Sequence, residues 1–510
     1  MSGWTNVRFY IASLSGLLLV ACATPQTPAP MSRSTAADPL APPGLSLIAE
    51  AEVRRDLFAL AGDDMRGREA GTLDELRASV WLAERAREAG LEPAGDDQTY
   101  FQFFSLRRLQ QSNTSRIAIG GQSLNLWRDV AVMTLTDTAV SAPIVWLENV
   151  DSATLAAHDL NGKVAATRVR PIGNLPSPQA SLYARRYTTA VVNALSQRLR
   201  ARGAAAVVLV ADSLADSAFE VVAANASRGR YLLSSANEPR VAPTMPTLLV
   251  RSTRLQAIST PGNRLDADLV ASSFLYPSVN VVARAPGTDP ALRNEYVLFS
   301  SHQDHDGVRG AVNGDSIWNG ADDNATTSVA LLAIGRAFVR HPGRRSALFV
   351  WHGAEERGLL GSNYHVQDPT VPRESIVAVL NGDMMGRNPA DSAALLGVIP
   401  PHRNSTALAQ MALAANRRTT GFAIDSTWDR TEHREGWYFR SDHLPYARAN
   451  IPALFFTTLL HGDYHTPLDE PSRIDVAKLT RMTKWMYATG WTVAVTAARP
   501  TIDPGFRLER

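Results

Sequence analysis

Cysteine is almost absent from this chain of 510 residues, in which Cys22 is the single example. This excludes an intrachain disulfide framework, a cysteine-based zinc finger and an iron–sulfur cluster. A metal site must therefore use histidine, aspartate and glutamate side chains. The chain also lacks an excess of charge of one sign, since 51 Lys and Arg face 49 Asp and Glu, for a net charge of +2. We therefore expect no nucleic-acid partner.

Long apolar runs are also scarce. The residues are 45% hydrophobic and 20% charged, as in an ordinary globular protein, which excludes a polytopic membrane protein. One mostly apolar run, Phe9 to Val20, follows Arg8. This run is shorter than the about 20 residues that a helix needs to span a bilayer. The pattern is typical of a secretory signal.

The run ends with Leu19-Val20-Ala21-Cys22, which resembles a bacterial lipobox. The resemblance implies that residues 1–21 are a lipoprotein signal peptide and that Cys22 is lipidated after cleavage. We therefore expect the membrane to be a partner through a lipid anchor at Cys22. The expected location is the bacterial cell envelope, facing the periplasm or the exterior. Residues 22–44 are rich in Pro, Ala, Ser and Thr, which predicts a disordered tether.

The rest of the chain divides by pattern into two parts. Residues 113–275 hold short apolar runs separated by Gly, Asn and Pro, which predicts an inserted β-rich or α/β module without its own catalytic site. Residues 45–112 and 276–510 then form one domain that the insert splits. Residues 45–92 predict two helices. The second helix is marked by apolar residues at helical spacing, Leu73, Leu76, Val80 and Ala83.

From residue 278 onward, strands, loops and helices alternate. Four near-continuous apolar runs predict strands that are buried on both faces. They are Tyr296–Ser300, Ala347–Trp351, Ile376–Leu380 and Pro452–Thr457. Thr326–Val339 predicts a helix between the first two. The expected fold class is therefore α/β, with a mostly parallel central sheet flanked by helices.

Polar clusters follow these predicted strands. Ten of the eleven histidines lie between His302 and His465. The clusters are Ser301-His302-Gln303-Asp304, Asn319 to Asn324, His352 to Glu356, Asn381-Gly382-Asp383 and Tyr464-His465-Thr466. Since parallel strands end at one edge of a sheet, we expect these side chains to converge there.

The chemistry of these clusters favours metal ions. Imidazoles and carboxylates suit zinc and accept manganese or cobalt. Three ligating carboxylates and a bridging hydroxide would together neutralise two divalent cations. Without metal, so many acidic groups on one rim would repel one another. Two adjacent ions also suit hydrolysis, since one polarises a carbonyl while both activate water.

The clusters belong to longer motifs. These are His302-x-Asp304, Gly320-Ala321-Asp322-Asp323-Asn324, Ala354-Glu355-Glu356-x-Gly358-Leu359-x-Gly361-Ser362, Asn381-x-Asp383-Met384-x-Gly386, Ser441-Asp442-His443-x-Pro445 and Tyr464-His465-Thr466-x-x-Asp469. As a set they resemble the di-zinc aminopeptidases and related glutamate carboxypeptidases, whose non-enzymatic cousins include transferrin receptor. The resemblance covers roughly residues 50–110 and 278–495. It implies the zinc-exopeptidase fold, and the insert resembles a protease-associated domain in pattern.

The resemblance also implies a site for two divalent metal ions, for which zinc is expected. One ion would be held by His302 and Asp383, and the other by Glu356 and His465. Asp323 would bridge them.

The same resemblance implies roles for further residues. Glu355 would be the general base, which takes a proton from water and passes it to the leaving amine. Tyr464 matches a position that donates to the oxyanion in some members. Asp304 is expected to orient His302 through its second ring nitrogen, and Asp442 and Asp469 are expected to support the ligands.

The expected activity is that of a metallo-aminopeptidase that removes N-terminal residues from peptides. Three alternatives stay open: a carboxypeptidase of acidic C-termini, a glutaminyl cyclase and a non-catalytic receptor-like relative. The sequence also leaves open whether the insert gates the site, builds a homodimer or binds long peptides. Four other histidines of the region are expected to be structural or solvent-facing: His305, His352, His443 and His461.

Overall fold

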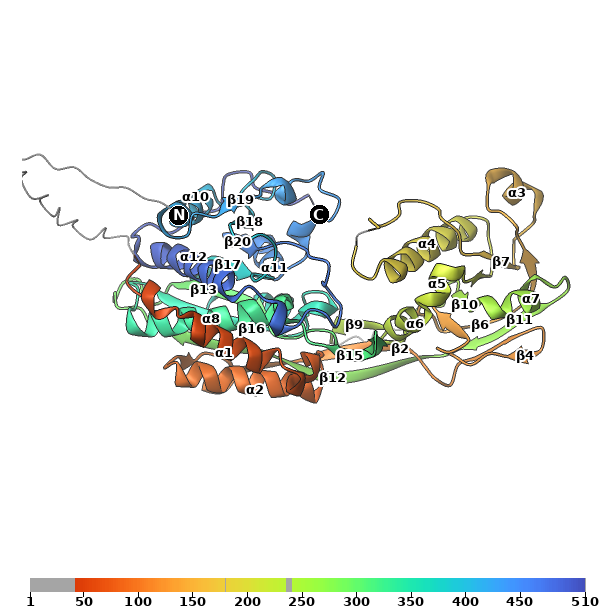
Figure 1. The fold of residues 1–510 in the computed structure, drawn as a ribbon, viewed down its shortest axis with the longest axis horizontal. Helices are drawn as coiled ribbons and strands as arrows, with labels where there is room; N and C mark the ends of the chain where they lie inside the picture. The colour runs from red at the N-terminus through yellow and green to blue at the C-terminus, as the bar shows by residue number, and fades with distance from the viewer. Residues whose placement is uncertain (1–41, 179, 235–240, 510) are drawn as a thin grey trace, which may run out of the picture. The chain divides into compact units, whose positions relative to one another are not determined.

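The computed structural model describes residues 42–178, 180–234 and 241–509 (Figure 1). The larger of the chain's two units spans residues 42–510 and holds all the described residues. The predicted signal peptide, Cys22 and most of the predicted tether lie outside the described residues. No helix in the described ranges has the length and apolar character needed to cross a membrane.

A ten-stranded sheet forms the centre of the larger unit. Its central strands are β20 (Ala453–Thr457), β17 (Ile376–Gly382), β13 (Tyr296–His302) and β16 (Ser346–His352), which run parallel and confirm the four predicted strands. Antiparallel pairs flank them on both sides, so the whole sheet is mixed. The outer strands are β1 (Glu92–Pro93), β2 (Phe101–Gln111), β9 (Arg230–Leu233), β12 (Ala271–Ala285), β18 (Ser392–Leu396) and β19 (Ala423–Ile424).

The central strands are buried on both faces. Along β13, Val297 and Phe299 pack into one core, whereas Tyr296 and Leu298 pack into the opposite one. This alternation follows from the two-residue period of a strand. Helices α9 (Leu360–Gln367) and α11 (His443–Arg448) cover the second face. The first face is covered by α1 (Glu50–Leu60), α2 (Leu73–Glu88), α8 (Thr326–Arg340), α10 (Thr406–Thr419) and α12 (Val476–Val495).

Helix α2 buries a different face from the one that its apolar spacing marks. Of the four residues that mark this spacing, Leu73, Leu76 and Val80 are 78%, 37% and 46% exposed, and only Ala83 is buried. The buried face instead includes Glu75, whose carboxylate accepts a hydrogen bond from the backbone N–H of Gly71 at 2.7 Å. Such a bond offsets part of the cost of burying a polar group.

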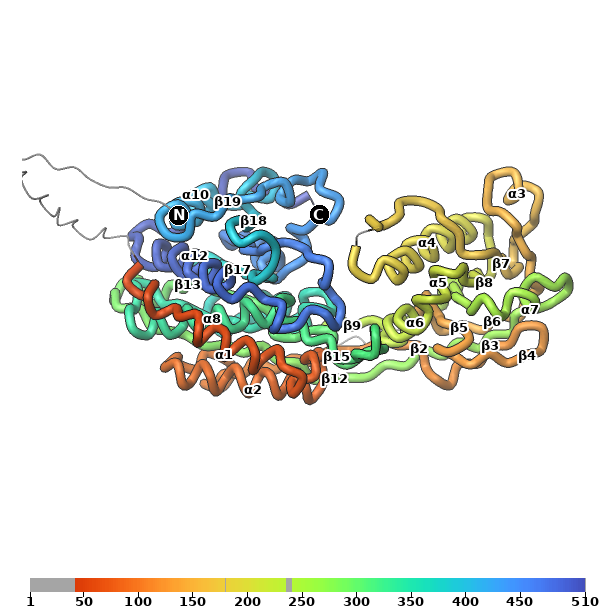
Figure 2. The backbone as a smooth tube through the Cα atoms, viewed as in Figure 1, coloured from red at the N-terminus to blue at the C-terminus, as the bar shows by residue number. Residues whose placement is uncertain are grey.

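A second, eight-stranded sheet lies within the segment predicted as an insert. Strands β2 and β12 connect it to the main sheet, since they pair continuously from Gln111–Ala271 to Phe101–Val281 (Figure 2). Strand β9 pairs with β2 and so belongs to the main sheet. The second sheet consists of β4 (Gln122–Ser123), β3 (Arg116–Ile119), β11 (Arg264–Leu269), β6 (Thr138–Trp146), β7 (Val164–Arg168), β8 (Ala206–Val210), β10 (Thr247–Val250) and β5 (Val130–Val132). Its helices are α3 (Ser152–Ala157), α4 (Tyr183–Arg200), α5 (Ser213–Ser217), α6 (Phe219–Ser227) and α7 (Leu255–Ser259).

Candidate metal centre

Three neighbouring parallel strands deliver polar side chains to one edge of the main sheet. His302 is the last residue of β13, and Asp383 directly follows β17. Glu355 and Glu356 lie in the helical turn Glu355–Arg357 just after β16. The carboxyl ends of parallel strands lie at the same edge, which is where α/β proteins bind ligands.

Two loops complete the centre. Asp323 lies in the turn Ala321–Ala325 that leads into α8. The carboxylate of Asp469 accepts hydrogen bonds from the backbone N–H groups of Asp322 and Asp323, each at 3.0 Å, and so fixes this turn. His465 lies in the loop after β20 and has a left-handed backbone, with φ of 52°.

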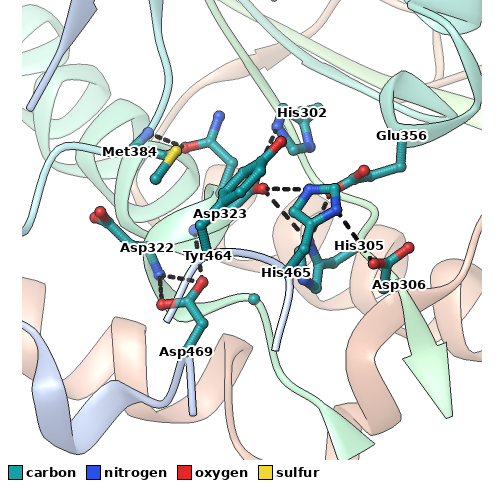
Figure 3. A network of polar contacts seen from close by, with 12 residues as sticks. His302, His305, Asp306, Asp322, Asp323, Glu356, Met384, Tyr464, His465 and Asp469 are labelled. Carbon is teal, nitrogen blue, oxygen red and sulfur yellow. Dashed lines mark hydrogen bonds and ion pairs between the residues drawn. The ribbon is translucent and has the colours of Figure 1, made fainter. Parts of the chain in front are cut away.

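Asp323 lies between the two histidines (Figure 3). Its Oδ1 is 3.2 Å from Nε2 of His302, and its Oδ2 is 3.0 Å from Nε2 of His465. Oδ1 of Asp383 lies 3.6 Å from His302 Nε2, and Oε1 of Glu356 lies 3.2 Å from His465 Nε2. The five residues thus form two groups that share one carboxylate.

The donor set fits divalent metal ions. His302 Nε2, Glu356 Oε1 and Asp383 Oδ1 are buried and have no hydrogen-bond partner among the described residues. Buried charged groups are stable when they are paired or coordinate a metal. Two imidazoles and three carboxylates are ligands that zinc prefers. The orphaned atoms are those that the two-ion arrangement would use.

Asp304 contacts His302 and both glutamates through different groups. His302 Nδ1 lies 3.1 Å from the backbone carbonyl of Asp304 but 3.9 Å from its carboxylate. The carboxylate instead accepts hydrogen bonds from the backbone N–H of Glu355 at 2.9 Å and of Glu356 at 3.3 Å. Asp304 thus contacts the second ring nitrogen of His302 through its backbone carbonyl, while its carboxylate is turned toward Glu355 and Glu356.

Glu355 faces the centre from the His302 side. Its Oε2 lies 3.7 Å from His302 Nε2, and burial raises its pKa well above the ordinary range. Asp442 is fully buried nearby, accepts a hydrogen bond from Ser362 and has its pKa raised to about 7 by burial. Ser441 donates to Asp383 Oδ2 at 2.8 Å, which leaves Oδ1 of Asp383 for a metal.

Tyr464 lies beside His465, with ring centroids 3.9 Å apart. Arg440 donates from Nη2 to its hydroxyl, and the guanidinium of Arg186, on α4, lies 5.9 Å from its ring centroid. Tyr464 and Arg186 also line a pocket of about 370 Å³, together with Glu435 and His461. The pocket thus combines residues of the main sheet's loops with residues of the insert.

Sequence reasoning missed two residues that contact the centre. Oδ2 of Asp306 lies 3.4 Å from Nδ1 of His465, on the opposite side of the ring from Asp323. His305 is fully buried, with Nδ1 2.8 Å from Glu356 Oε1. The feature of the sequence that points to them is their position directly after the His302-x-Asp304 motif. They lie in the loop that follows a predicted strand, at the edge of the sheet where the other site residues were expected.

The sequence of this chain is similar to those of known peptidases. Peptidase family M28 matches residues 280–490. A probable leucine aminopeptidase of Arthroderma benhamiae is 26% identical over 254 residues, which are 47% of this chain and 64% of that protein. A probable leucine aminopeptidase of Arthroderma otae is 25% identical over 45% of this chain and 60% of its own length. The chain thus spans less than two thirds of these curated relatives.

Solved structures show the same fold. BSAP, a zinc aminopeptidase from Bacillus subtilis, aligns over 90% of this chain and 99% of its own, with a TM-score of 0.56 and 17% identity. The aminopeptidase from Aneurinibacillus sp. strain AM-1 aligns over 90% and 97%, with a TM-score of 0.54 and 17% identity. These likenesses confirm the expected α/β fold. The likeness to peptidase family M28 lies within residues 280–490, which hold the central strands and the candidate metal centre.

Proposed function

We propose that this protein is a metal-dependent aminopeptidase that uses two divalent ions, most simply zinc. The observation that carries the proposal is the position of Asp323, whose two carboxylate oxygens lie 3.2 Å from His302 and 3.0 Å from His465. His302 and Asp383 would hold one ion, and Glu356 and His465 the other. Bound ions of this kind activate water and polarise the scissile carbonyl.

The chain's own residues supply the proton transfers and part of the charge stabilisation. Glu355 takes a proton from the attacking water and later gives it to the leaving amine as the carbon–nitrogen bond breaks. Burial raises its pKa above that of an ordinary glutamate, which is the direction that makes a carboxylate a better proton acceptor. Tyr464 donates its hydroxyl proton toward the oxyanion.

Metal content and hydrolysis test the proposal together. The purified chain is dialysed against chelator, reloaded with zinc, and assayed on a panel of aminoacyl anilides. We expect two zinc ions per chain, loss of hydrolysis on chelation and recovery on reloading. Full hydrolysis in excess chelator would refute the metal requirement. A single ion per chain would favour the glutaminyl cyclase alternative, and two ions without hydrolysis would favour the receptor-like one.

One observation favours a second candidate, the carboxypeptidase of acidic C-termini. Two arginines from different parts of the chain, Arg440 and Arg186, meet at Tyr464. Guanidinium groups bind carboxylates through paired hydrogen bonds. Acyl-glutamate substrates, compared with aminoacyl anilides, separate the two candidates. Under this second proposal, Arg186→Gln lowers hydrolysis of acyl-glutamate substrates and leaves metal content unchanged.

We also propose that the protein acts on peptides in the bacterial cell envelope, held to a membrane by lipid on Cys22. The support is the Leu19-Val20-Ala21-Cys22 sequence after an apolar run.

A further inference from the structure

His305 is a buried imidazole with no ordinary partner. It lies three residues after the end of β13 and is fully buried, and neither ring nitrogen has a hydrogen-bond partner among the described residues. A buried polar group without a partner is costly. Nδ1 lies 2.8 Å from Glu356 Oε1 and 3.9 Å from Asp323 Oδ2, so the ring faces the candidate metal centre (Figure 3).

The fold makes room for this ring in this position. Gly320 has a left-handed backbone with φ of +59°, and a Cβ atom there would lie only 2.2 Å from Cγ of His305. The guanidinium of Arg68 is fully buried and donates to the backbone carbonyls of Gln303 at 2.7 Å, Asn319 at 2.7 Å and Gly320 at 2.8 Å. Arg68 thus joins the two loops that enclose His305.

The distances suit a shared ion. Four atoms lie within 4.8 Å of one another, one each from His305, Asp323, Glu356 and His465. Ligands about 2.0–2.1 Å from a tetrahedral zinc ion lie roughly 3.3 Å apart. The separations here are 3.0 Å for Asp323–His465, 3.2 Å for Glu356–His465 and 2.8 Å for His305–Glu356. We infer that His305, through Nδ1, is a fourth protein ligand of the ion held by Asp323, Glu356 and His465.

This inference rests on the proposed two-ion function. It adds that the two ions would differ in their number of protein ligands. The ion at Asp323, Glu356, His465 and His305 would have four protein ligands. The ion at His302, Asp383 and the other oxygen of Asp323 would have three. Closed four-ligand sites are typical of structural zinc, and three-ligand sites with an open position are typical of catalytic zinc. The open position would lie on the His302 side, where Glu355 also lies.

The competing role for His305 is a hydrogen bond from Nδ1 to Glu356. His305→Asn separates the roles, because its amide N–H reaches the position of Nδ1 and donates but supplies no ring nitrogen to a metal. His305→Ala removes both functions. His365→Asn is the matched control, since His365 is an equally buried imidazole whose Nδ1 contacts Tyr446 at 2.8 Å, away from the centre.

Zinc retained per chain is measured at graded chelator concentrations, and circular dichroism checks that each variant is folded. We expect one of the two ions to bind at least about 10-fold more weakly in both His305 variants, since loss of even a supporting group costs roughly 10–100-fold, and to bind unchanged in the control. Wild-type affinity in His305→Asn would reduce His305 to a hydrogen-bond donor and overturn the inference. A wild-type chain without zinc would instead overturn the proposed function.

A measurement on the wild type covers the case in which the variants do not fold. Cobalt-loaded protein is examined by proton NMR, in which each metal-bound imidazole gives a strongly shifted exchangeable N–H signal. Three such signals are expected, from His302, His305 and His465. Two signals would refute ligation by His305.

Discussion

Arg440 donates a hydrogen bond from Nη2 to the hydroxyl of Tyr464 at 3.0 Å. Because the hydroxyl accepts this bond, its own proton is free to point toward a substrate. Burial raises the pKa of Tyr464 well above its usual value, so the hydroxyl stays protonated at neutral pH.

Tyr464→Phe should therefore lower kcat while KM and zinc content change little. Loss of one oxyanion donor costs roughly 10²–10³-fold in kcat. Steady-state kinetics on an aminoacyl anilide and metal analysis check this. Tyr364→Phe, in a partly buried tyrosine that bonds Asp368, is the control. An unchanged kcat would remove Tyr464 from the mechanism.

Glu355→Gln should keep the fold and both ions but lose turnover. General acid–base catalysis contributes roughly 10²–10⁴-fold, which is the expected decrease in kcat. Glu92→Gln, which changes a surface ion pair with Arg284, is the matched control. Near-normal turnover in Glu355→Gln with full zinc content would show that another group moves the proton.

Asp469→Asn should weaken metal binding although it changes none of the residues that would bind the metal. The carboxylate of Asp469 holds the backbone of Asp322 and Asp323, and an amide can accept fewer of these bonds. Loss of such a supporting group typically costs about 10–100-fold in metal affinity. Competition with a chromogenic chelator measures it. Asp463→Asn, which removes an ion pair with Arg387 outside the centre, should leave zinc affinity as in the wild type.

Glu75 should make the protein less stable as the pH rises. Its carboxylate accepts hydrogen bonds from Gly71 N–H and Ser278 Oγ, yet burial raises its pKa from 4.5 to about 8. The folded state therefore binds the proton more tightly than the unfolded state. The resulting stability is fully present below pH 4.5 and is lost as the pH rises through about 8.

The free energy of unfolding should fall by up to about 1.4 kcal/mol per pH unit across this window because of Glu75. In Glu75→Gln, which cannot ionise, this part of the slope should vanish. The free energy of unfolding is measured by urea denaturation at several pH values for the wild type and for Glu75→Gln. The difference between the two proteins gives the contribution of Glu75. Glu84→Gln, on the exposed side of the same helix, should keep the wild-type slope. Identical slopes in wild type and Glu75→Gln would contradict the assignment.

Cys22→Ser should release the protein from membranes. Without the thiol no lipid can be attached, and the apolar run before Cys22 is shorter than a membrane-spanning helix. Fractionation of expressing bacterial cells, followed by detection in soluble and membrane fractions, measures this. Retention of Cys22→Ser in the membrane fraction would refute the lipid anchor.

The sequence predicted the central strands because both of their faces are buried. Tyr296–Ser300 is apolar at nearly every position, and the strand extends only two residues further, to His302. Strands and helices that are exposed on one face show weaker patterns in the sequence. Strand β9 lies inside the predicted insert but pairs with β2, a partner that no local pattern in Arg230–Leu233 reveals.

The position of His305 could not be predicted from its neighbours in the chain. His305 can be buried there because Gly320 has no side chain to occupy the space of its ring. Its burial also depends on the guanidinium of Arg68, a residue far away in the sequence, which bonds the backbone of Gly320. The same holds for Arg186, which reaches Tyr464 from the insert. Motifs identify residues that share a strand end, whereas these residues meet through tertiary packing.

The origin of the ligands in separate strand ends has a thermodynamic consequence. His302, Asp323, Glu356, Asp383 and His465 come from five segments, so an unfolded chain holds no partial copy of the site. Ions would then bind the native state almost exclusively. An ion present at 100 times its Kd would add about 2.7 kcal/mol to the free energy of unfolding by mass action. Metal supply in the surroundings would thereby raise or lower the fraction of chains that are folded, as well as decide whether they can act.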